Sequence, residues 1–571
     1  MSAIDWTVLI LSLVFIVVYG VFKGRGSRDL KGYLMADRNI RWYIVALSVM
    51  ATQASAITFI STPGQAFSDG MRFVQFYFGL PLAMIVLSIT VVPIYHKLKV
   101  YTAYEYLESR FDLKTRGLAA VLFLIQRGFA AGLTIYAPAI ILSTLLGLNI
   151  YITNLVIGVL VIIYTASGGS KAVSWTQTQQ MIIIMAAMAG AFFMILHLLP
   201  KDVSFTDALF VAGKMGKLNA IDFSFDLSSR YNIWSGLLGG FFLALSYFGT
   251  DQSQVQRYLT GKSITHSRLG LLANGLVKVP MQFFILLLGA LVFVFYQFTP
   301  SPLFFNTVES QGVRDGQWGK EYRVIEQQYE AVSQEKAELV KKLIQARHNG
   351  NKTERAAVEE KLDGVEKRAS AVREQGVALI RKHSANEDVG DTNYVFLSFV
   401  LKYMPVGLLG LIIAAIVAAS MSSTSSELNA LASTTVVDIY KRVLKKDGSD
   451  RHYLVASKLL TVAWGIFAII FAQYANRLGT LVEAVNILGS LFYGTILGIF
   501  LTAFYIKSVR GAAAFYAAIF AEAGVLLCFL FTDISYLWYN VVGCFLVIVF
   551  SLLINRIWFL GKEKGGRQDE G

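Results

Sequence analysis

The sequence predicts an all-α membrane protein with about 13 transmembrane helices, because its apolar runs are long and its charge is low. Of its 571 residues, 55% are hydrophobic and only 16% are charged, whereas soluble proteins carry about a quarter charged residues. The mean hydropathy is +0.54. The runs are too long and alternate too little for β-barrel strands. The predicted spans are 5–23, 40–61, 73–95, 116–147, 149–166, 173–199, 231–260, 268–298, 394–425, 453–474, 479–506, 511–531 and 536–558.

Basic residues gather in alternate loops, and this pattern predicts how the chain is oriented in the membrane. The first apolar run lies between Asp5 and Lys23 without a small-residue cleavage site, so we expect it to stay as a span. We therefore predict an outer N-terminus, a cytoplasmic C-terminus and a location in the plasma (inner) membrane. The net charge of +13 then reflects membrane topology and not a nucleic-acid partner. The basic loops are 23–41, 96–116, 257–268, 441–451 and 556–567.

Reactive side chains of the kind that a membrane-embedded enzyme needs are not clustered in the sequence. The two cysteines, Cys528 and Cys544, lie inside predicted spans and are interpreted as packing residues. The six histidines lie in or beside loops, or in a polar insertion, without metal-ligand spacing. The sequence therefore predicts that the protein is not an enzyme.

A polar, densely charged segment interrupts the membrane pattern at 301–393. Residues 326–348 and 353–383 are each typical of a helix, and Asn349-Gly350-Asn351 between them is typical of a turn. We predict an extracytoplasmic helical hairpin, which is either a tolerated insertion or a lid or docking arm for a protein partner. The flanking parts are then membrane regions at 1–300 and 394–560 and a cytoplasmic tail at 561–571.

Six hydroxyl residues crowd into two turns of an otherwise apolar helix at 420–426. Ser422, Ser425 and Ser426 fall at i, i+3 and i+4, so they share one face, and Ala419 and Ser423 form a neighbouring pair. A hard monovalent cation such as sodium prefers oxygen ligands of this kind. The alternative is close helix packing, which small residues also permit.

Polar breaks interrupt two predicted spans, at 51–58 and at 246–252. Each break begins a set of five spans, 40–199 and 231–506, once the insertion is set aside. Interrupted helices at corresponding places in two halves are typical of a transporter binding site. Unwound backbone at membrane depth is tolerated where it lines a cavity.

Four charged residues lie within apolar sequence, where an unpaired charge is costly. Lys278 and Glu483 are interpreted as substrate or gate residues, and Arg127 and Glu522 as a structural pair or as side chains that reach the interface. Tyr247 is either an aromatic gate over a small solute or a core aromatic.

The chain resembles the sodium/solute symporters, which include the sodium/glucose, proline, sialic acid, pantothenate and monocarboxylate carriers. The resemblance covers nearly all of the chain outside the insertion and implies a five-plus-five inverted-repeat fold of the leucine-transporter type. The motifs that carry it are Val100 to Phe111, Tyr164 to Thr176, Asp251 to Tyr258, Ala418 to Asn429 and Asp438 to Lys441.

The family resemblance implies a sodium site between the first broken helix and the serine-rich helix. Its ligands would be the backbone carbonyls of Ala51, Ala54 and Ala419 and the hydroxyls of Ser422 and Ser423. Some relatives bind a second sodium at positions that match Ser422, Ser425, Ser426 and an Asp after Trp-Thr. This chain has Gln177 after Trp175-Thr176, and its neutral amide favours a weak second site and one sodium per solute.

In sugar-carrying relatives the substrate is approached by positions that match Gln53, Thr58, Tyr77, Tyr247, Lys278 and Glu483. Relatives often have Asn, an acid and Gln where this chain has Gln53, Tyr77 and Glu483, so the pocket differs from that of a glucose or galactose carrier. Lys278 is expected either to meet a carboxylate or to pair with Glu483.

The resemblance and the residues together predict a sodium-coupled symporter that imports a small polar organic solute by alternating access. The solute would be a sugar, a sugar derivative or a small carboxylate, and sodium would be transported, not held as a prosthetic group. The alternative is a transporter-like receptor that binds solute without moving it.

Overall fold

The computed structural model describes residues 1–571 except 25–28, 148, 385–388, 476–480 and 566–571. Its regular structure is helical, apart from an isolated bridge between Ile40 and Gly261 in the described part of the chain. In chain order the elements are α1 (Ala3–Gly24), α2 (Leu30–Met35), η1 (Ala36–Arg38), α3 (Trp42–Gln53), α4 (Ala56–Asp69), η2 (Gly70–Tyr77), α5 (Leu80–Ile89), α6 (Val91–Leu98), α7 (Glu105–Arg110), α8 (Leu113–Leu146), α9 (Ile150–Leu198), α10 (Phe205–Lys214), η3 (Ser235–Gly239), α11 (Gly240–Gly249), α12 (Gln252–Leu259), α13 (Ile264–Phe298), α14 (Thr307–Asp315), α15 (Gly319–His348), α16 (Lys352–Ser384), α17 (Thr392–Tyr403), α18 (Leu408–Thr434), η4 (Thr435–Leu444), α19 (Asp450–Ala472), α20 (Leu481–Tyr505), α21 (Gly511–Phe531) and α22 (Tyr536–Gly565).

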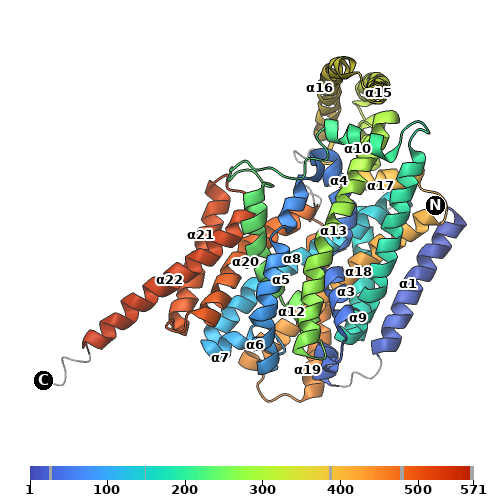
Figure 1. The fold of residues 1–571 in the computed structure, drawn as a ribbon. Coiled ribbons are helices and arrows are strands. Elements are labelled where there is room, and N and C mark those ends of the chain that lie inside the picture. The colour runs from blue at the N-terminus through green and yellow to red at the C-terminus, as the bar shows by residue number, and fades with distance from the viewer. Residues whose placement is uncertain (25–28, 148, 385–388, 476–480, 566–571) are drawn as a thin grey trace.

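The helices form a bundle of membrane-spanning length (Figure 1). Within the described residues, 10 helical segments are long and apolar enough to cross a membrane. Three shorter apolar helices, Trp42–Gln53, Ile150–Ile163 and Ser235–Gly249, fall within further predicted spans. The structure therefore supports a multi-span helical membrane protein, and the number 13 stays a prediction.

Both predicted breaks are present in the chain. Helix α3 ends at Gln53, Ala54 and Ser55 leave helical geometry with ψ angles of 74° and 173°, and α4 begins at Ala56. Helix α11 ends before Thr250, and Asp251 is extended and caps α12 by accepting a hydrogen bond from the Ser253 N–H at 2.8 Å. Each break therefore frees backbone groups in the middle of the bundle.

Helix α9 carries two predicted spans, 149–166 and 173–199, joined through a kink. At Gly169 the backbone has φ 63° and ψ 179°, a conformation that glycine adopts readily. A Cβ at this position would lie 2.9 Å from the Tyr33 carbonyl oxygen. The kink therefore needs a residue without a side chain.

The serine-rich helix α18 lies at the centre of the bundle. It packs against α1, α3, α4, α8 and α9, and nearly all of its side chains are buried. Because α18 contacts both α3 and α4, its hydroxyl residues lie beside the first broken helix. The Asp5 carboxylate at the start of α1 also accepts hydrogen bonds from the N–H groups of Gly407 and Gly410, at 2.7 and 3.1 Å.

The insertion folds into two long helices, α15 and α16, which lie side by side at one end of the bundle (Figure 1). Helix α15 begins at Gly319 and not at the expected residue 326, because Tyr322 and Ile325 join a small apolar core with α16. That core also contains Leu303, Phe304, Val313, Tyr329, Ala369, Val377, Leu379 and Ile380.

Ion pairs attach this helical pair to the bundle, and one of them joins Lys214 Nζ of α10 to Glu359 Oε1 of α16 at 2.8 Å. At its turn, Arg347 Nη1 and His348 Nε2 lie 3.0 and 2.9 Å from Asp207 Oδ1 on α10. At its base, Arg373 Nη2 lies 2.8 Å from Asp391 Oδ1, just before α17. Helix α17 packs in turn against α4, so the insertion is connected to the second half of the first broken helix.

Candidate functional site

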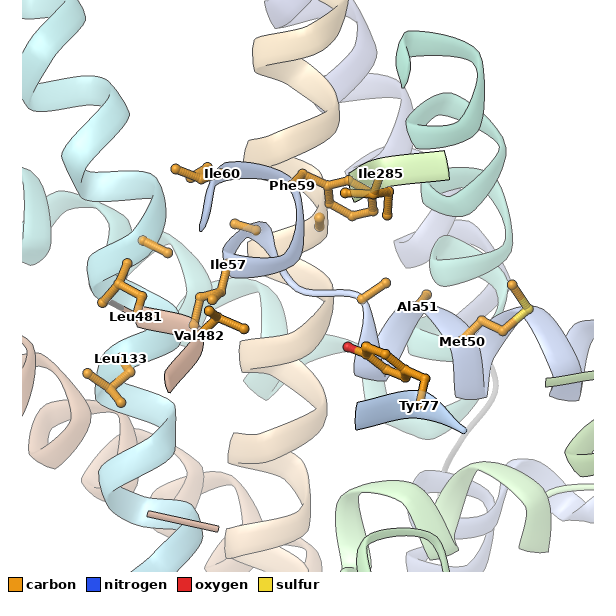
Figure 2. Close-up of a cluster of buried hydrophobic side chains, with 14 of the residues drawn as sticks. Met50, Ala51, Ile57, Phe59, Ile60, Tyr77, Leu133, Ile285, Leu481 and Val482 are labelled. Carbon is orange, nitrogen blue, oxygen red and sulfur yellow. The ribbon is translucent and has the colours of Figure 1, made fainter. Parts of the chain in front are cut away.

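The end of α3 and the middle of α18 meet where the hydroxyl residues crowd. The Ser423 hydroxyl donates to the carbonyl oxygen of Thr52 at 3.2 Å and lies 3.4 Å from that of Ala51. Figure 2 shows the chain passing from Met50 and Ala51 through a non-helical stretch into α4. The two predicted partners of the sodium site, the broken helix and the serine-rich helix, are therefore in contact.

The other predicted sodium ligands lie in the same buried region. Ser422 is 1% exposed, and its hydroxyl has no hydrogen-bond partner among the described residues. Ala54 and Ala419 are buried, at 0% and 1% exposure. A buried hydroxyl without a hydrogen-bond partner has lost its contacts with water and gained none from the protein. Ser422 is therefore a candidate ligand for an ion.

Gln177 of α9 occupies the neighbouring position, where the family resemblance places a second sodium. Its Nε2 donates to the hydroxyls of Ser426 and Thr52 at 2.8 and 2.9 Å, and its Oε1 accepts from Ser48. The Ser425 hydroxyl turns away and donates to the Ser422 carbonyl at 3.0 Å. A cation at this position would need the oxygens of Ser426 and Thr52, which the Gln177 amide already contacts.

A cavity opens beside the break, with about 700 Å³ of empty space including its opening to solvent. The cavity contains hydroxyl, amide and aromatic groups, together with two charged side chains. Its lining consists of Thr52, Gln53, Ser55, Ile57, Thr58, Phe76, Tyr77, Arg127, Thr134, Leu243, Tyr247, Glu427, Val482, Val485, Asn486 and Tyr493.

Four of the six predicted substrate residues, Gln53, Thr58, Tyr77 and Tyr247, line this cavity. Tyr247 is tied down at its hydroxyl, which accepts a hydrogen bond from Gln254 Nε2 at 2.7 Å. Tyr77 lies next to the break, as Figure 2 shows with Ala51 and Met50. The first broken helix, η2 and α11 thus each contribute to the cavity wall.

Lys278 and Glu483 lie outside the lining. Glu483 pairs with Arg230, 2.8 Å away, and accepts from the Tyr231 hydroxyl at 3.2 Å. Lys278 is fully buried in α13, with its Nζ 5.7 Å from the centroid of the Tyr77 ring and no hydrogen-bond partner among the described residues. Of the two alternatives for Lys278, the pair with Glu483 is wrong, because Arg230 pairs with the Glu483 carboxylate.

Arg127 is the centre of a buried ionic group that the sequence indicated only in part. Its Nη1 lies 3.0 Å from Glu427 Oε1, and its Nη2 pairs with Asp251 and with the Tyr493 hydroxyl. The expectation of a structural pair holds for Arg127, although its partner is not Glu522. Glu427 was missed, and the signal for it was an acid directly after Ser426 in an apolar helix.

Two helices interrupted at a polar cavity, inside a bundle of membrane-spanning helices, define a membrane transporter. The family model of the sodium:solute symporter family matches residues 33–308 and 373–521, and the chain belongs to this family. Between these two stretches the match leaves out 309–372, which contains most of α14, all of α15 and the first part of α16.

Curated relatives extend this likeness over most of the chain. The chain is 25% identical over 569 residues to the sodium/sialic acid symporter SiaT of Proteus mirabilis, covering 98% of this chain and 96% of the relative. It is 24% identical to the sodium/sialic acid symporter NanT of Aliivibrio fischeri, over 97% of this chain and 93% of the relative. It is 33% identical to human sodium-coupled monocarboxylate transporter 1, over 45% of this chain and 42% of the relative.

A solved structure shares the fold. The substrate-bound outward-open state of a Na⁺-coupled sialic acid symporter superposes with a TM-score of 0.75 at 22% identity, covering 98% of both chains. The architecture of the family is therefore that of this chain as well.

Proposed function

We propose that this protein is a sodium-coupled symporter that imports a small polar organic solute by alternating access. The observation that carries the proposal is the contact between Ser423 and the carbonyls of Ala51 and Thr52, next to the unpartnered Ser422 hydroxyl and the polar cavity. Sodium would be held by the carbonyls of Ala51, Ala54 and Ala419 and the hydroxyls of Ser422 and Ser423. Such an oxygen-only site suits a hard cation.

Sodium coupling follows from where this site lies. An ion between α3 and α18 would hold the first half of the broken helix against α18, and thereby favour one shape of the cavity beside the break. The movement of one positive charge down about 100 mV supplies about 2.3 kcal/mol. One sodium per solute is proposed, since Gln177 already contacts the oxygens of Ser426 and Thr52.

The solute class is proposed from the cavity and from the relatives. Gln53, Thr58, Tyr77 and Tyr247 would contact a sugar, a sugar derivative or a small carboxylate, with hydroxyl and amide groups for hydrogen bonds and rings for stacking. Lys278 and Glu483 would affect solute binding only indirectly, through neighbouring residues. For Lys278 such a neighbour is Tyr77, whose ring lies beside it.

The orientation is proposed from the basic loops. Helices α6, α7 and α19, which flank the basic loops 96–116 and 441–451, lie at the end of the bundle away from α15 and α16 (Figure 1). Basic loops prefer the cytoplasmic side, so the hairpin and the N-terminus would be outside. We also propose that the helices form a five-plus-five inverted repeat and that the hairpin binds a protein partner.

Uptake into proteoliposomes tests the proposal. The purified full-length chain is reconstituted and offered labelled sugars, sialic acid and short carboxylates, with an inward gradient of either sodium or choline. We expect at least one compound to accumulate only with sodium, and Ser423→Ala to need more sodium than Ser433→Ala. The Ser433 hydroxyl bonds within its own helix, to the Ala430 carbonyl at 3.0 Å, and is the matched control.

Two outcomes would overturn the proposal. Sodium-dependent binding without uptake would favour the receptor, and accumulation that is equal in choline would remove the sodium coupling.

A further inference from the structure

The charged side chains at the cavity carry more negative than positive charge. Arg127 carries one positive charge, and Glu427 and Asp251 carry two negative charges, so the formal sum for the group is −1 when all three are ionised. The three residues are 3%, 5% and 1% exposed. Arg127 and Glu427 line the cavity, and Asp251 lies behind them as the second partner of Arg127.

Both carboxylates are held in place by hydroxyl groups in addition to Arg127. Thr134 Oγ1 donates to Glu427 Oε2 at 2.8 Å, while the other Glu427 oxygen faces Arg127. The Tyr493 hydroxyl donates to Asp251 Oδ2 at 2.7 Å, and the Ser253 hydroxyl donates to Asp251 Oδ1 at 2.6 Å. The anions are therefore part of a built network, and a solute meets them already positioned.

A solute carboxylate would meet an arginine whose two terminal nitrogens are already bound to anions. To pair with Arg127 it would have to displace Glu427 and leave that carboxylate buried without its counter-charge, which is strongly unfavourable. It would also add a negative charge to a group of side chains whose formal sum is already −1, at low dielectric. Lys278 is not a direct partner for a solute carboxylate, because it lies outside the lining with its Nζ 5.7 Å from the centroid of the Tyr77 ring.

Neutral hydrogen-bonding groups of a solute would find unpaired partners in this region. Arg127 Nε is a buried donor and Gln53 Oε1 a buried acceptor, and neither has a hydrogen-bond partner among the described residues. Thr52, Thr58 and Asn486 add further neutral donors and acceptors to the lining. A solute hydroxyl or amide group can satisfy both kinds of atom without disturbing the ionic network, and an ammonium group can donate to Gln53 Oε1.

We propose that the cavity selects neutral or cationic solutes, rich in hydroxyl or amide groups, over carboxylates of the same shape, and that Glu427 sets this preference. The inference rests on the proposed symport function and narrows it. It separates this chain from a carrier in which a free arginine receives an acidic solute. Glu427 also follows Ser426 directly on α18, so the same helix presents the specificity residue to the cavity and hydroxyls to the sodium site.

A panel matched in shape and differing in charge tests the inference. Binding to the purified full-length chain is measured by thermal stabilisation in sodium and in choline, with glucose, glucosamine and glucuronate as one set. Sialic acid methyl ester with sialic acid, and lactamide with lactate, form two further sets. We expect sodium-dependent binding by neutral or cationic members, with half-saturating concentrations about tenfold or more below those of their acidic counterparts, as for a buried charge mismatch.

Substitution of Glu427 checks the assignment to this residue. In Glu427→Gln the disadvantage of the acidic members is expected to shrink by about tenfold, because a solute carboxylate can then use Arg127 without displacing an anion. Glu522→Gln removes a buried acid of α21 that is outside the lining, and is expected to keep the wild-type order. Thr134→Val loosens Glu427 without removing its charge and should shift the ratio in the same direction as Glu427→Gln.

The outcomes separate the two levels of the proposal. Sodium-dependent binding in which the acidic members are preferred by the wild-type protein would overturn the charge selection and leave symport standing. A panel with no sodium-dependent binding at all would overturn the proposed function and the selection with it. If Glu427→Gln does not fold, the wild-type order alone decides.

Discussion

The hydroxyl of Ser423 lies 3.2 Å from the carbonyl oxygen of Thr52 and donates a hydrogen bond to it. These residues are 371 positions apart in sequence, and they join the serine-rich helix α18 to the last turn of α3. The contact brings backbone carbonyls at a helix end, hydroxyl groups and a polar cavity into one place. The account of function depends on this juxtaposition.

Ser422→Ala is expected to weaken sodium binding without weakening the fold. The Ser422 hydroxyl is buried without a hydrogen-bond partner in the described part of the chain, so its removal leaves no other polar atom unsatisfied. Loss of one oxygen ligand, worth about 1 kcal/mol, would raise the half-saturating sodium concentration about fivefold.

Thermal unfolding of the Ser422→Ala protein, titrated with sodium, measures this effect. Its melting temperature in choline should equal that of the wild type, while the sodium-induced rise should be smaller. An equal rise in both proteins would show that Ser422 does not contact the ion.

Gln177→Glu is expected to create a second sodium dependence. The substitution keeps the shape of the side chain and puts a carboxylate among the hydroxyls of Ser48, Thr52 and Ser426. In choline this buried charge would have only the contacts with these hydroxyls, so the protein should be less stable than the wild type. Sodium should restore the stability, and the sodium curve for uptake should become steeper.

Gln177→Met is the control for lost hydrogen bonds, because it removes the hydrogen bonds of Gln177 without adding a charge. It should be destabilised equally in choline and in sodium. A sodium curve of unchanged steepness in Gln177→Glu would contradict the interpretation that the amide stands in a second cation position.

Gln53→Leu and Lys278→Met are expected to affect solute binding differently. Gln53 lines the cavity and presents an unpartnered acceptor, whereas Lys278 lies outside the lining. The loss of one solute hydrogen bond in Gln53→Leu should raise the half-saturating solute concentration about fivefold. Lys278→Met should leave that concentration within about twofold and should not destabilise the protein, since it removes an unpaired buried amine.

Uptake measured over a range of solute concentrations, together with melting temperatures, distinguishes these two variants. A loss of solute affinity in Lys278→Met as large as that in Gln53→Leu would contradict the placement of Lys278 outside the binding surface.

Asp207→Asn is expected to loosen the turn between α15 and α16. Burial raises the pKa of Asp207, but hydrogen bonds from the Ser204 hydroxyl, the Ser204 backbone and His348 outweigh it and hold the pKa below the ordinary 3.8. Because the folded pKa is lowered, this stabilisation is fully present above about pH 4 and is lost as the pH falls through the folded value. The Asp207 carboxylate should therefore stay ionised between pH 7 and pH 5.

Hydrogen exchange of residues 340–355 at pH 7 and pH 5 measures the attachment. Protection, which is the exchange rate corrected for the intrinsic rate at each pH, should be lower in Asp207→Asn than in the wild type at both pH values. Glu335→Gln removes an exposed pair with Arg368 inside the hairpin and is expected to change little. Unchanged exchange in Asp207→Asn would show that Arg347 and His348 do not anchor the turn.

Local sequence signals predicted the parts of the site that lie within one helix. The hydroxyls at 420–426, the break at 51–58 and the break at 246–252 are each visible as polar residues inside an apolar run. The helix ends at Gln53 and Gly249 follow from them, because unwound backbone needs a cavity to line.

Contacts between distant residues could not be predicted in the same way. Arg127 and Glu427 are 300 positions apart, and nothing in either helix alone indicates that they face each other. Lys278 and Glu483 illustrate the opposite error, because charge alone suggested a pair that Arg230 forms instead. Helix α15 starts early, at Gly319, because Tyr322 packs against the partner helix α16. The helical pattern predicted from the sequence began only at residue 326 and did not include this contact.

Direct binding of radioactive sodium to the purified protein, in the absence of any solute, tests the central claim most directly. The account predicts saturable binding of about one ion per chain, weakened in Ser423→Ala and unchanged in Ser433→Ala. Equal binding by all three proteins, or none that saturates in the wild type, would contradict a sodium site between α3 and α18.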